Sequence, residues 1–243
     1  MTVIGPYINS AAIFFGAVLG ASLGGRVPEV LRTNLTLIFG LSSMSMGVVM
    51  IAKVAQMPAM IFPIVIGTLI GEIIRLENGI NKLAMSTKII IEKILPKPNK
   101  NNQSQDEFLA KFVALVIMFS FSGSGVFGSM NEGATGDMSI LIIKSFLDFF
   151  TAVIFSTSLG FSVATIFVPQ LILQLLLAYS AVLIKPYITP QMLADFSAVG
   201  GILMVATGFR ICGIKMFRLG NMLPALFLAM PISALWTAFF LKL

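Results

Sequence analysis

Apolar residues fall into long runs that alternate with short polar breaks along most of the chain. Each run is about 20 residues long, which matches the hydrocarbon core of a bilayer, and β-strand alternation is absent. The pattern predicts an all-α, polytopic transmembrane helix bundle of about eight spans, with seven as the alternative count. The predicted spans are residues 7–23, 34–52, 58–74, 108–128, 139–159, 162–184, 193–211 and 222–241.

The boundary between the fifth and sixth spans is the least distinct. Only Gly160, Phe161 and Ser162 separate the two spans, and none of them is charged. Pro169 then interrupts the sixth run. A broken helix or a re-entrant segment at residues 160–169 is therefore an alternative, because irregular backbone is tolerated at membrane depth where it faces protein or water.

One long polar segment, residues 76–107, divides the single membrane domain of residues 1–243 into a three-span part and a five-span part. Up to Pro96 its apolar positions fall near one helical face, which predicts an amphipathic helix on the cytoplasmic membrane surface. A polar linker at residues 99–105 follows this helix.

A weak inverted repeat is a further expectation. Residues 39–47 resemble residues 196–204 in their small residues, and both parts of the chain end with a span that opens near a proline, Pro58 or Pro224. The second and third spans would be inverted relative to the seventh and eighth, as in many transporters. Apolar sequences also resemble one another through composition alone.

Glycines recur every fourth residue in two spans, at Gly16, Gly20 and Gly24 and at Gly67 and Gly71. Small residues at this spacing let two helix backbones approach closely. The stripes fit either a subunit interface or packing within one chain, and we expect a homo-oligomer.

Charge is sparse and unevenly placed. Only 11% of the residues are charged, whereas soluble domains carry about 25%. With the N-terminus outside, twelve Lys and Arg residues fall on the cytoplasmic side and four on the other, so both termini are predicted outside. The net charge of +6 then indicates basic loops beside membrane lipids rather than a nucleic-acid partner. Arg210, Lys215 and Arg218 form one such cluster, either an anchor or a contact for lipid headgroups or another anion.

Enzyme chemistry finds little support in the composition. The chain has no histidine and one cysteine, Cys212, so the usual general base and the commonest metal ligand are missing. Residues 123–128 match G-x-G-x-x-G, but that motif binds a dinucleotide only within a βαβ unit. We therefore predict no enzymatic activity, no cofactor and no metal site.

The fifth span carries two charges, Lys144 and Asp148, one helical turn apart. A charge at bilayer depth costs roughly 2.5–3.5 kcal/mol on insertion scales. The pair is either a neutralised structural bridge or a switchable pair that a substrate or an ion breaks. A substrate or ion path is predicted at this point.

Small and polar residues in neighbouring segments are candidates for the same path. A loosened helix end after Ser120 would expose carbonyl and hydroxyl groups, and two glutamines share one face of the sixth span. Glu132 and Asp137 would form an acidic outer mouth, with an N-cap of the fifth span as the alternative role of Asp137. The candidate path residues are Lys144, Asp148, Ser120, Ser122, Gly123, Ser124, Gly125, Gly128, Asn131, Gln170 and Gln174.

Several short motifs follow one another in a distinctive order. They are GSGVFGSMNEG from residue 123, Gly-Asp at 136–137, Lys144-Ser145 with Asp148, STSLG at 156–160, FRICGIK at 209–215 and GNMLPA at 220–225. The ordered set resembles the bacterial integral membrane family called domain of unknown function 554, over nearly the whole chain. The resemblance implies a helical protein of the bacterial inner membrane. The family stretch near residues 133–137 tends to be richer in glycine and often has proline, whereas this chain has Gly-Ala-Thr-Gly-Asp.

The sequence thus predicts membrane transport of a small ion or polar solute through a path beside the fifth span. No P-loop is present, so a pump that hydrolyses ATP by itself is not expected. A passive channel is one alternative. The other is a non-transporting membrane scaffold or partner subunit, in which Lys144 and Asp148 would form a structural bridge.

Overall fold

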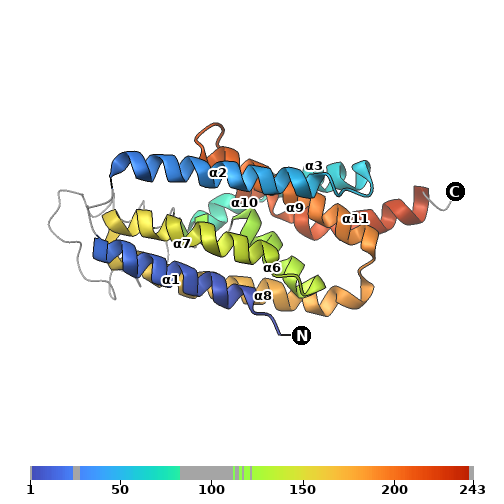
Figure 1. Cartoon of the computed structure of the whole chain (residues 1–243). Coiled ribbons are helices and arrows are strands. Elements are labelled where there is room, and N and C mark those ends of the chain that lie inside the picture. Colours follow the sequence, from blue (N-terminus) through green and yellow to red (C-terminus); the bar gives the residue numbers. More distant parts are fainter. Residues whose placement is uncertain are drawn as a thin grey trace.

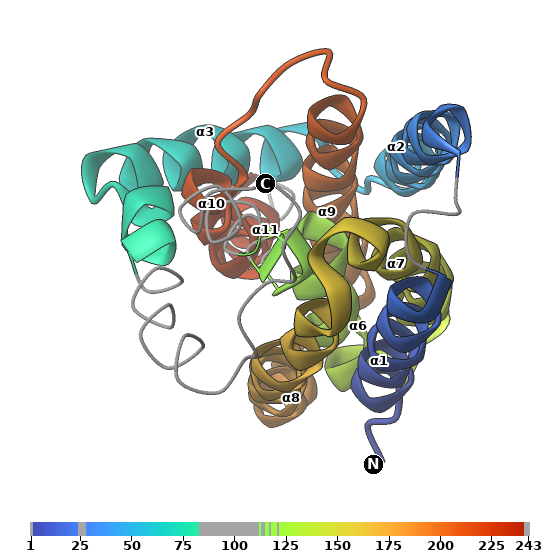
Figure 2. The ribbon, with the colours of Figure 1, turned by 90° about the vertical axis from the view of Figure 1, so that its left-hand side faces the viewer.

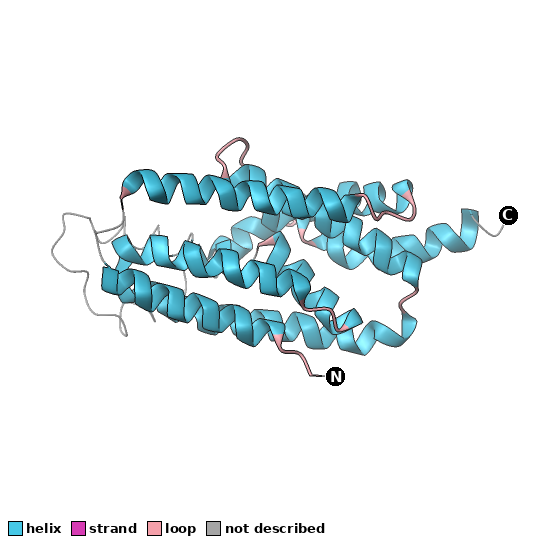
Figure 3. Ribbon diagram, viewed as in Figure 1, coloured by secondary structure: helices cyan, strands magenta, loops and turns pink. Residues whose placement is uncertain are grey.

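The computed structural model describes residues 2–23, 28–82, 112, 115–116, 118–120 and 122–240. The regular elements of these residues are all helical (Figure 3). The long helices are α1 (Gly5–Leu23), α2 (Glu29–Ile51), α3 (Met57–Ile73), α6 (Gly123–Thr135), α7 (Ser139–Leu159), α8 (Phe167–Ile184), α9 (Pro190–Ile211) and α11 (Pro224–Phe240). The short ones are Leu76–Lys82, η2 (Gly160–Ile166), η3 (Lys185–Tyr187) and α10 (Leu219–Met222). The prediction of an all-α membrane helix bundle is confirmed.

Five helical stretches among the described residues are long and apolar enough to cross a bilayer, and a sixth is added if α3 and its bent continuation Leu76–Lys82 count as one. One of the five, Ser139–Tyr187, has 49 residues, more than twice the length that one crossing requires. It contains both the fifth and the sixth predicted spans. Residues 83–107 and most of residues 108–121 lie outside the described part of the chain.

The chain reverses direction between α7 and α8 through the 3-10 helix η2 (Figures 1 and 2). Gly160 opens this turn at a φ of +66°, a conformation that residues with a side chain rarely adopt. Pro169 lies in the first turn of α8, where its missing N–H leaves no helical bond unmade. The predicted irregularity therefore separates two helices and does not break the sixth span.

Glycines bring two antiparallel helix pairs into backbone contact. On α2, Gly40 faces Gly208 of α9, and Gly47 faces Gly201. A Cβ at any of these four positions would overlap the facing helix. The seven-residue spacing recurs on both helices, and the contacts between the four glycines are reciprocal. Gly67 and Gly71 of α3 pack in the same way against the start of α11 and against α10.

The glycine stripe of α1 is also used inside the chain. Gly16 and Gly20 lie against the backbone carbonyls of Phe149 and Val153 on α7, and α1 and α7 run parallel (Figure 1). Gly24 lies outside the described residues. The interpretation of these stripes as a subunit interface is wrong, because the close backbone approach that glycine permits is taken up by helices of the same chain.

Two apolar cores result. One centres on α9 and α11, where Phe127 of α6 packs on Phe196 at 4.9 Å between ring centroids. The other joins α1, α7 and η2 around Ile13, Val163 and Ile166. Helix α6 contacts α7, α8 and α9, so its first residues reach the region between the two cores.

Candidate functional site

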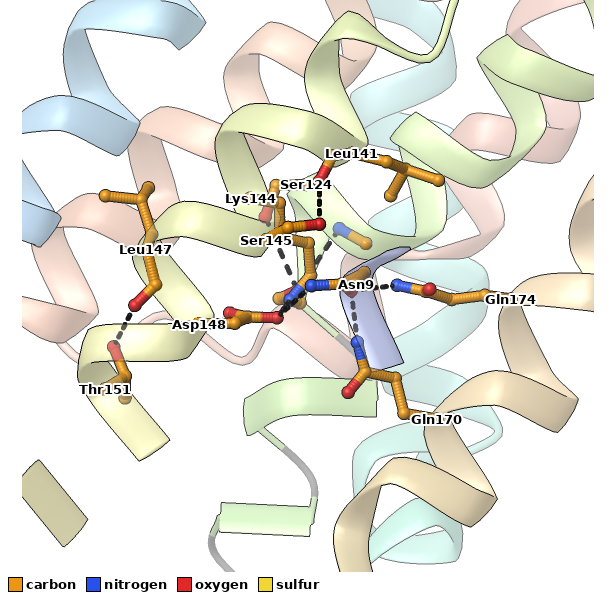
Figure 4. A network of polar contacts seen from close by, with 12 residues as sticks. Asn9, Ser124, Leu141, Lys144, Ser145, Leu147, Asp148, Thr151, Gln170 and Gln174 are labelled. Atoms are coloured by element: carbon orange, nitrogen blue, oxygen red, sulfur yellow. Dashed lines mark hydrogen bonds and ion pairs between the residues drawn. The ribbon is translucent and has the colours of Figure 1, made fainter. Parts of the chain in front are cut away.

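Five buried polar side chains from α1, α7 and α8 form one connected cluster (Figure 4). The Lys144 ammonium pairs with Oδ2 of Asp148, which also accepts from Nδ2 of Asn9 at 2.8 Å. Oδ1 of Asn9 accepts from Nε2 of Gln174 at 2.8 Å and from Nε2 of Gln170. Asp148 is 9% exposed and Lys144 3%, and the three amides are fully buried. We call these five residues the polar cluster.

Helical spacing explains why the cluster forms. Lys144 and Asp148 are four residues apart on α7, as are Gln170 and Gln174 on α8, so each pair lies on one face of its helix. Asn9 stands near the start of α1, between the two pairs (Figure 4). One asparagine therefore links a charged pair on one helix to an amide pair on another.

The ionised carboxylate sets the direction of every hydrogen bond in the cluster. Asp148 can only accept, so Asn9 turns its Nδ2 toward it and its Oδ1 toward the glutamines. Both glutamines then turn Nε2 toward Asn9. Their Oε1 atoms have no partner among the residues that the structure describes, and unsatisfied polar atoms in a buried site are uncommon.

Helix α6 begins at the cluster. The backbone is extended at Ser122, whose Oγ accepts from the amide of Gly125 at 3.2 Å and so caps a new helix that continues to Thr135. The predicted end of the fourth span at residue 128 is therefore wrong, because α6 continues to Thr135. A serine cap and flexible glycines restart the helix at a place where hydropathy alone shows one continuous run.

Gly125 packs directly on the cluster. A Cβ at this position would lie 2.9 Å from Cε of Lys144, 3.0 Å from Oγ of Ser122 and 3.5 Å from Nε2 of Gln174. The absence of a side chain thus lets α6 approach both α7 and α8 at the level of the charged pair.

A cavity of about 340 Å³ adjoins the cluster. Lys144, Asp148, Ser122, Ser124 and Arg210 are among the residues that line it. Its walls are largely apolar. They include Phe39, Met118, Leu147 and Phe155. A cavity of this size holds a small organic molecule or about ten waters, at about 30 Å³ for each water.

The basic cluster predicted as a lipid or anion contact has protein partners. Nη1 of Arg210 donates to Glu77 at 3.3 Å, and Nη1 of Arg218 donates to Glu72 at 3.1 Å. Glu77 also accepts from the amide of Gly220 at 3.1 Å. Lys215 is exposed. Arg210 and Glu77 therefore place a second ion pair on the cavity wall.

The two acidic residues predicted at an outer mouth have separate roles. Glu132 is 3% exposed and accepts from the amides of Ile4 and Gly5, so it satisfies the first residues of α1. Its burial contradicts the expected acidic mouth. Asp137 is exposed and accepts from the amide of Ser139, the first residue of α7, at 2.9 Å, although the N-cap position itself is held by Met138. Hydrogen bonds from the Ser139 hydroxyl and amide lower the pKa of Asp137.

Four predicted path residues remain. Gly123 is the first residue of α6, and Ser120 is buried just before it, with no partner for its hydroxyl among the described residues. Gly128 instead packs on Leu141, and Nδ2 of Asn131 donates to the carbonyl of Asp137 at 3.1 Å. These last two lie away from the cavity lining.

Sequence reasoning missed Asn9, which connects the charged pair to the glutamines. The available signal was an amide side chain inside an otherwise apolar span, the same signal that identified the two glutamines. It was overlooked because Asn9 stands near a span end, where polar residues are ordinary.

The comparisons with known proteins agree with this architecture. The model of the family described as protein of unknown function (DUF554) matches residues 4–234. The chain belongs to this family. It is 53% identical to the uncharacterized protein YqgA of Escherichia coli over 98% of this chain and 99% of the relative. It is 24% identical to the uncharacterized membrane protein YdfK of Bacillus subtilis, again over 98% and 99%. No solved structure matches the chain.

Family membership and the apolar helices together identify a helical membrane protein. Neither relative's name states a substrate. The chemistry of the site therefore has to be inferred from its own geometry.

Proposed function

We propose that this protein transports a small ion or polar solute across the membrane, along a path beside α7. One observation carries the proposal: a buried ion pair, Lys144 and Asp148, forms part of the wall of a cavity of about 340 Å³. Ionisable residues held inside membrane bundles are costly, and they mark ion or substrate pathways more often than they serve packing. The hydroxyls of Ser122 and Ser124 add neutral ligands to the same wall.

The proposed path has a second charged point. Arg210, near the end of α9, pairs with Glu77 on the cavity wall. By the distribution of basic residues this is the cytoplasmic end, with both termini outside, in the inner membrane of a bacterium. The cavity would then face the cytoplasm, and release of the Arg210–Glu77 pair would widen its inner end.

Transport by this route requires the Lys144–Asp148 pair to open. A solute that carries a charge or a strong hydrogen-bonding group would contact Asp148 while the lysine moves into the cavity. The path would be completed by α6 and α8, because Gly125 and Gln174 lie against the same pair. A homo-oligomer in membrane lipids remains the expected assembly.

The test is flux into proteoliposomes with a panel of ions, organic acids and amino acids, comparing wild type with Asp148→Asn. We expect the variant to stay folded by size exclusion and to lose at least nine-tenths of the flux, because the only carboxylate of the cluster is gone. Asp137→Asn is the matched control, since it removes an exposed carboxylate that does not line the cavity.

Three outcomes would speak against the proposal. Full flux in Asp148→Asn would place the path elsewhere. If wild type shows no flux and Asp148→Asn no longer assembles, the scaffold alternative is favoured. Flux that never saturates with solute concentration would favour a passive channel.

A further inference from the structure

Two oxygen acceptors of the polar cluster point away from its donors. Oε1 of Gln170 and Oε1 of Gln174 are fully buried, and neither has a hydrogen-bond partner in the described part of the chain. Two unsatisfied acceptors one helical turn apart, beside a carboxylate, are unusual in a folded interior. Acceptor oxygens without donors are what a cation requires when it leaves its hydration shell.

The three amides converge on one point. Nε2 of Gln170 and Nε2 of Gln174 both reach the same atom, Oδ1 of Asn9, and Nδ2 of Asn9 lies 2.8 Å from Asp148. Terminal amide torsions are soft and roughly two-fold, so a half-turn of a glutamine amide brings its oxygen to the position of its nitrogen. Amide oxygens and a carboxylate would then surround a single site, and these are the ligands that hard cations prefer.

We propose that Asn9, Asp148, Gln170 and Gln174 form a binding site for a small alkali cation, which competes with the Lys144 ammonium for Asp148. The inference deepens the proposed function, because it names the ion class at the centre of that path. Lys144 lies at Asp148 as the internal competitor of the cation.

Charge balance makes the exchange obligatory. The cluster contains one carboxylate and one ammonium, so a second positive charge would be repelled strongly in a buried site of low dielectric constant. The cation can bind only when Lys144 withdraws. The lysine stem is flexible, it lines the cavity, and Gly125 leaves the space beside its Cε free of a side chain. Binding of the cation thus moves a positive charge into the cavity, toward Ser122 and Ser124.

Removal of the competitor gives the sharpest test. Wild type, Lys144→Gln and the double variant Lys144→Gln/Asp148→Asn are titrated with LiCl, NaCl and KCl against choline chloride, at constant ionic strength, and thermal unfolding is followed in detergent. Ligand binding to the folded state raises the unfolding temperature. We expect Lys144→Gln to bind at least one of the three cations at least tenfold more tightly than wild type does. The double variant, which keeps the volume but has no carboxylate, should not respond.

The glutamines are tested in the same background. Gln174→Leu added to Lys144→Gln should weaken the apparent cation affinity at least tenfold, whereas Gln56→Leu, which alters a part-buried glutamine away from the cluster, should not. If Lys144→Gln does not fold, the wild type is instead labelled with an amine-reactive reagent. We then expect severalfold more modification of Lys144 in one alkali chloride than in choline chloride.

The inference is overturned if no alkali cation shifts Lys144→Gln beyond choline, or if the shift persists without Asp148. In the labelling assay, equal modification of Lys144 in all salts overturns it. The proposed function fails separately: a cation-binding protein with no solute flux in any gradient would retain this site and lose the transport proposal. Solute flux in a protein that binds no alkali cation would retain the transport proposal and overturn the cation site.

Discussion

Two aspartates are buried in the described part of the chain, and their surroundings differ in kind. Asp195 is fully buried on α9, where Oδ1 accepts from the amides of Ala55 and Gln56, and Oδ2 accepts from the Ser233 hydroxyl at 2.6 Å. All of these donors are neutral, two from the backbone between α2 and α3 and one from a side chain of α11. Asp148 instead depends on a flexible lysine and an amide, beside a cavity.

The contrast shows that burial of a carboxylate is not by itself a sign of function. Asp195 has a structural role, since it satisfies the two backbone amides that immediately precede α3. Asp148 has a partner that can leave and neighbours with unused acceptors. A site that binds and releases a ligand needs surroundings like those of Asp148, where a partner of the carboxylate can move away.

The largest expected effect is on stability at Asp195. Asp195→Ala leaves two backbone amides and a hydroxyl without an acceptor, which should lower the free energy of unfolding by about 3 kcal/mol or more. Thermal unfolding in detergent measures it, with Asp137→Ala as the control. An unfolding temperature equal to that of the control would remove the distinction between the two buried aspartates.

The opposite result is expected when the charged pair is replaced as a unit. Lys144→Met with Asp148→Leu should leave stability unchanged or raise it by about 1–4 kcal/mol, because well-packed apolar side chains often replace a buried ion pair without loss. Flux in proteoliposomes should be abolished. A double variant that unfolds as early as Asp195→Ala would assign a structural role to the pair.

A smaller effect is expected at the contact between α6 and the cluster. In Gly125→Ala the added Cβ would lie within 3.0 Å of Lys144 and Ser122, so we expect about 1–2 kcal/mol of destabilisation from overpacking and reduced flux. Gly79→Ala is the matched control, since its Cβ would meet nothing within 4 Å. Flux and unfolding are measured side by side. Equal behaviour of the two variants would contradict the tight packing of α6 on Lys144.

The smallest effect concerns the exposed carboxylate at the start of α7. The pKa of Asp137 is lowered in the folded state by its bonds to Ser139, so its stabilisation is present above the unfolded pKa of about 3.9 and is lost as pH falls. Solvent screening limits the contribution to a fraction of 1 kcal/mol. Unfolding temperatures from pH 6 to pH 3.5 should fall slightly more for wild type than for Asp137→Asn. Parallel curves would show that this carboxylate contributes nothing measurable.

Prediction from sequence succeeded where a one-dimensional pattern carries the information. Apolar runs locate α1, α2, α7 and α9 because bilayer thickness imposes a length that hydropathy shows directly. The i and i+4 spacing of Lys144 and Asp148 predicted their contact for the same kind of reason, since helix geometry relates neighbours on one face.

Prediction failed where the outcome depends on which helices meet. The start of α6 at Gly123 was not foreseen, because residues 120–125, small apart from Phe121, leave the mean hydropathy of the segment high and do not show where one helix ends and the next begins. Glu132 was placed at an outer mouth, although its partners are amides more than 120 residues earlier in the chain.

The amino-acid sequence alone determined that this is a helical membrane protein with a charged pair inside one of its spans. Hydrophobicity and helical spacing are properties of short stretches of sequence, so they do not depend on which helices pack together. Only the tertiary structure decided that Asn9 joins that pair to Gln170 and Gln174, and that the cavity reaches Asp148 while Asp195 is fully satisfied. Helix–helix packing, governed by glycines that admit a facing backbone, sets those distances between residues remote in sequence.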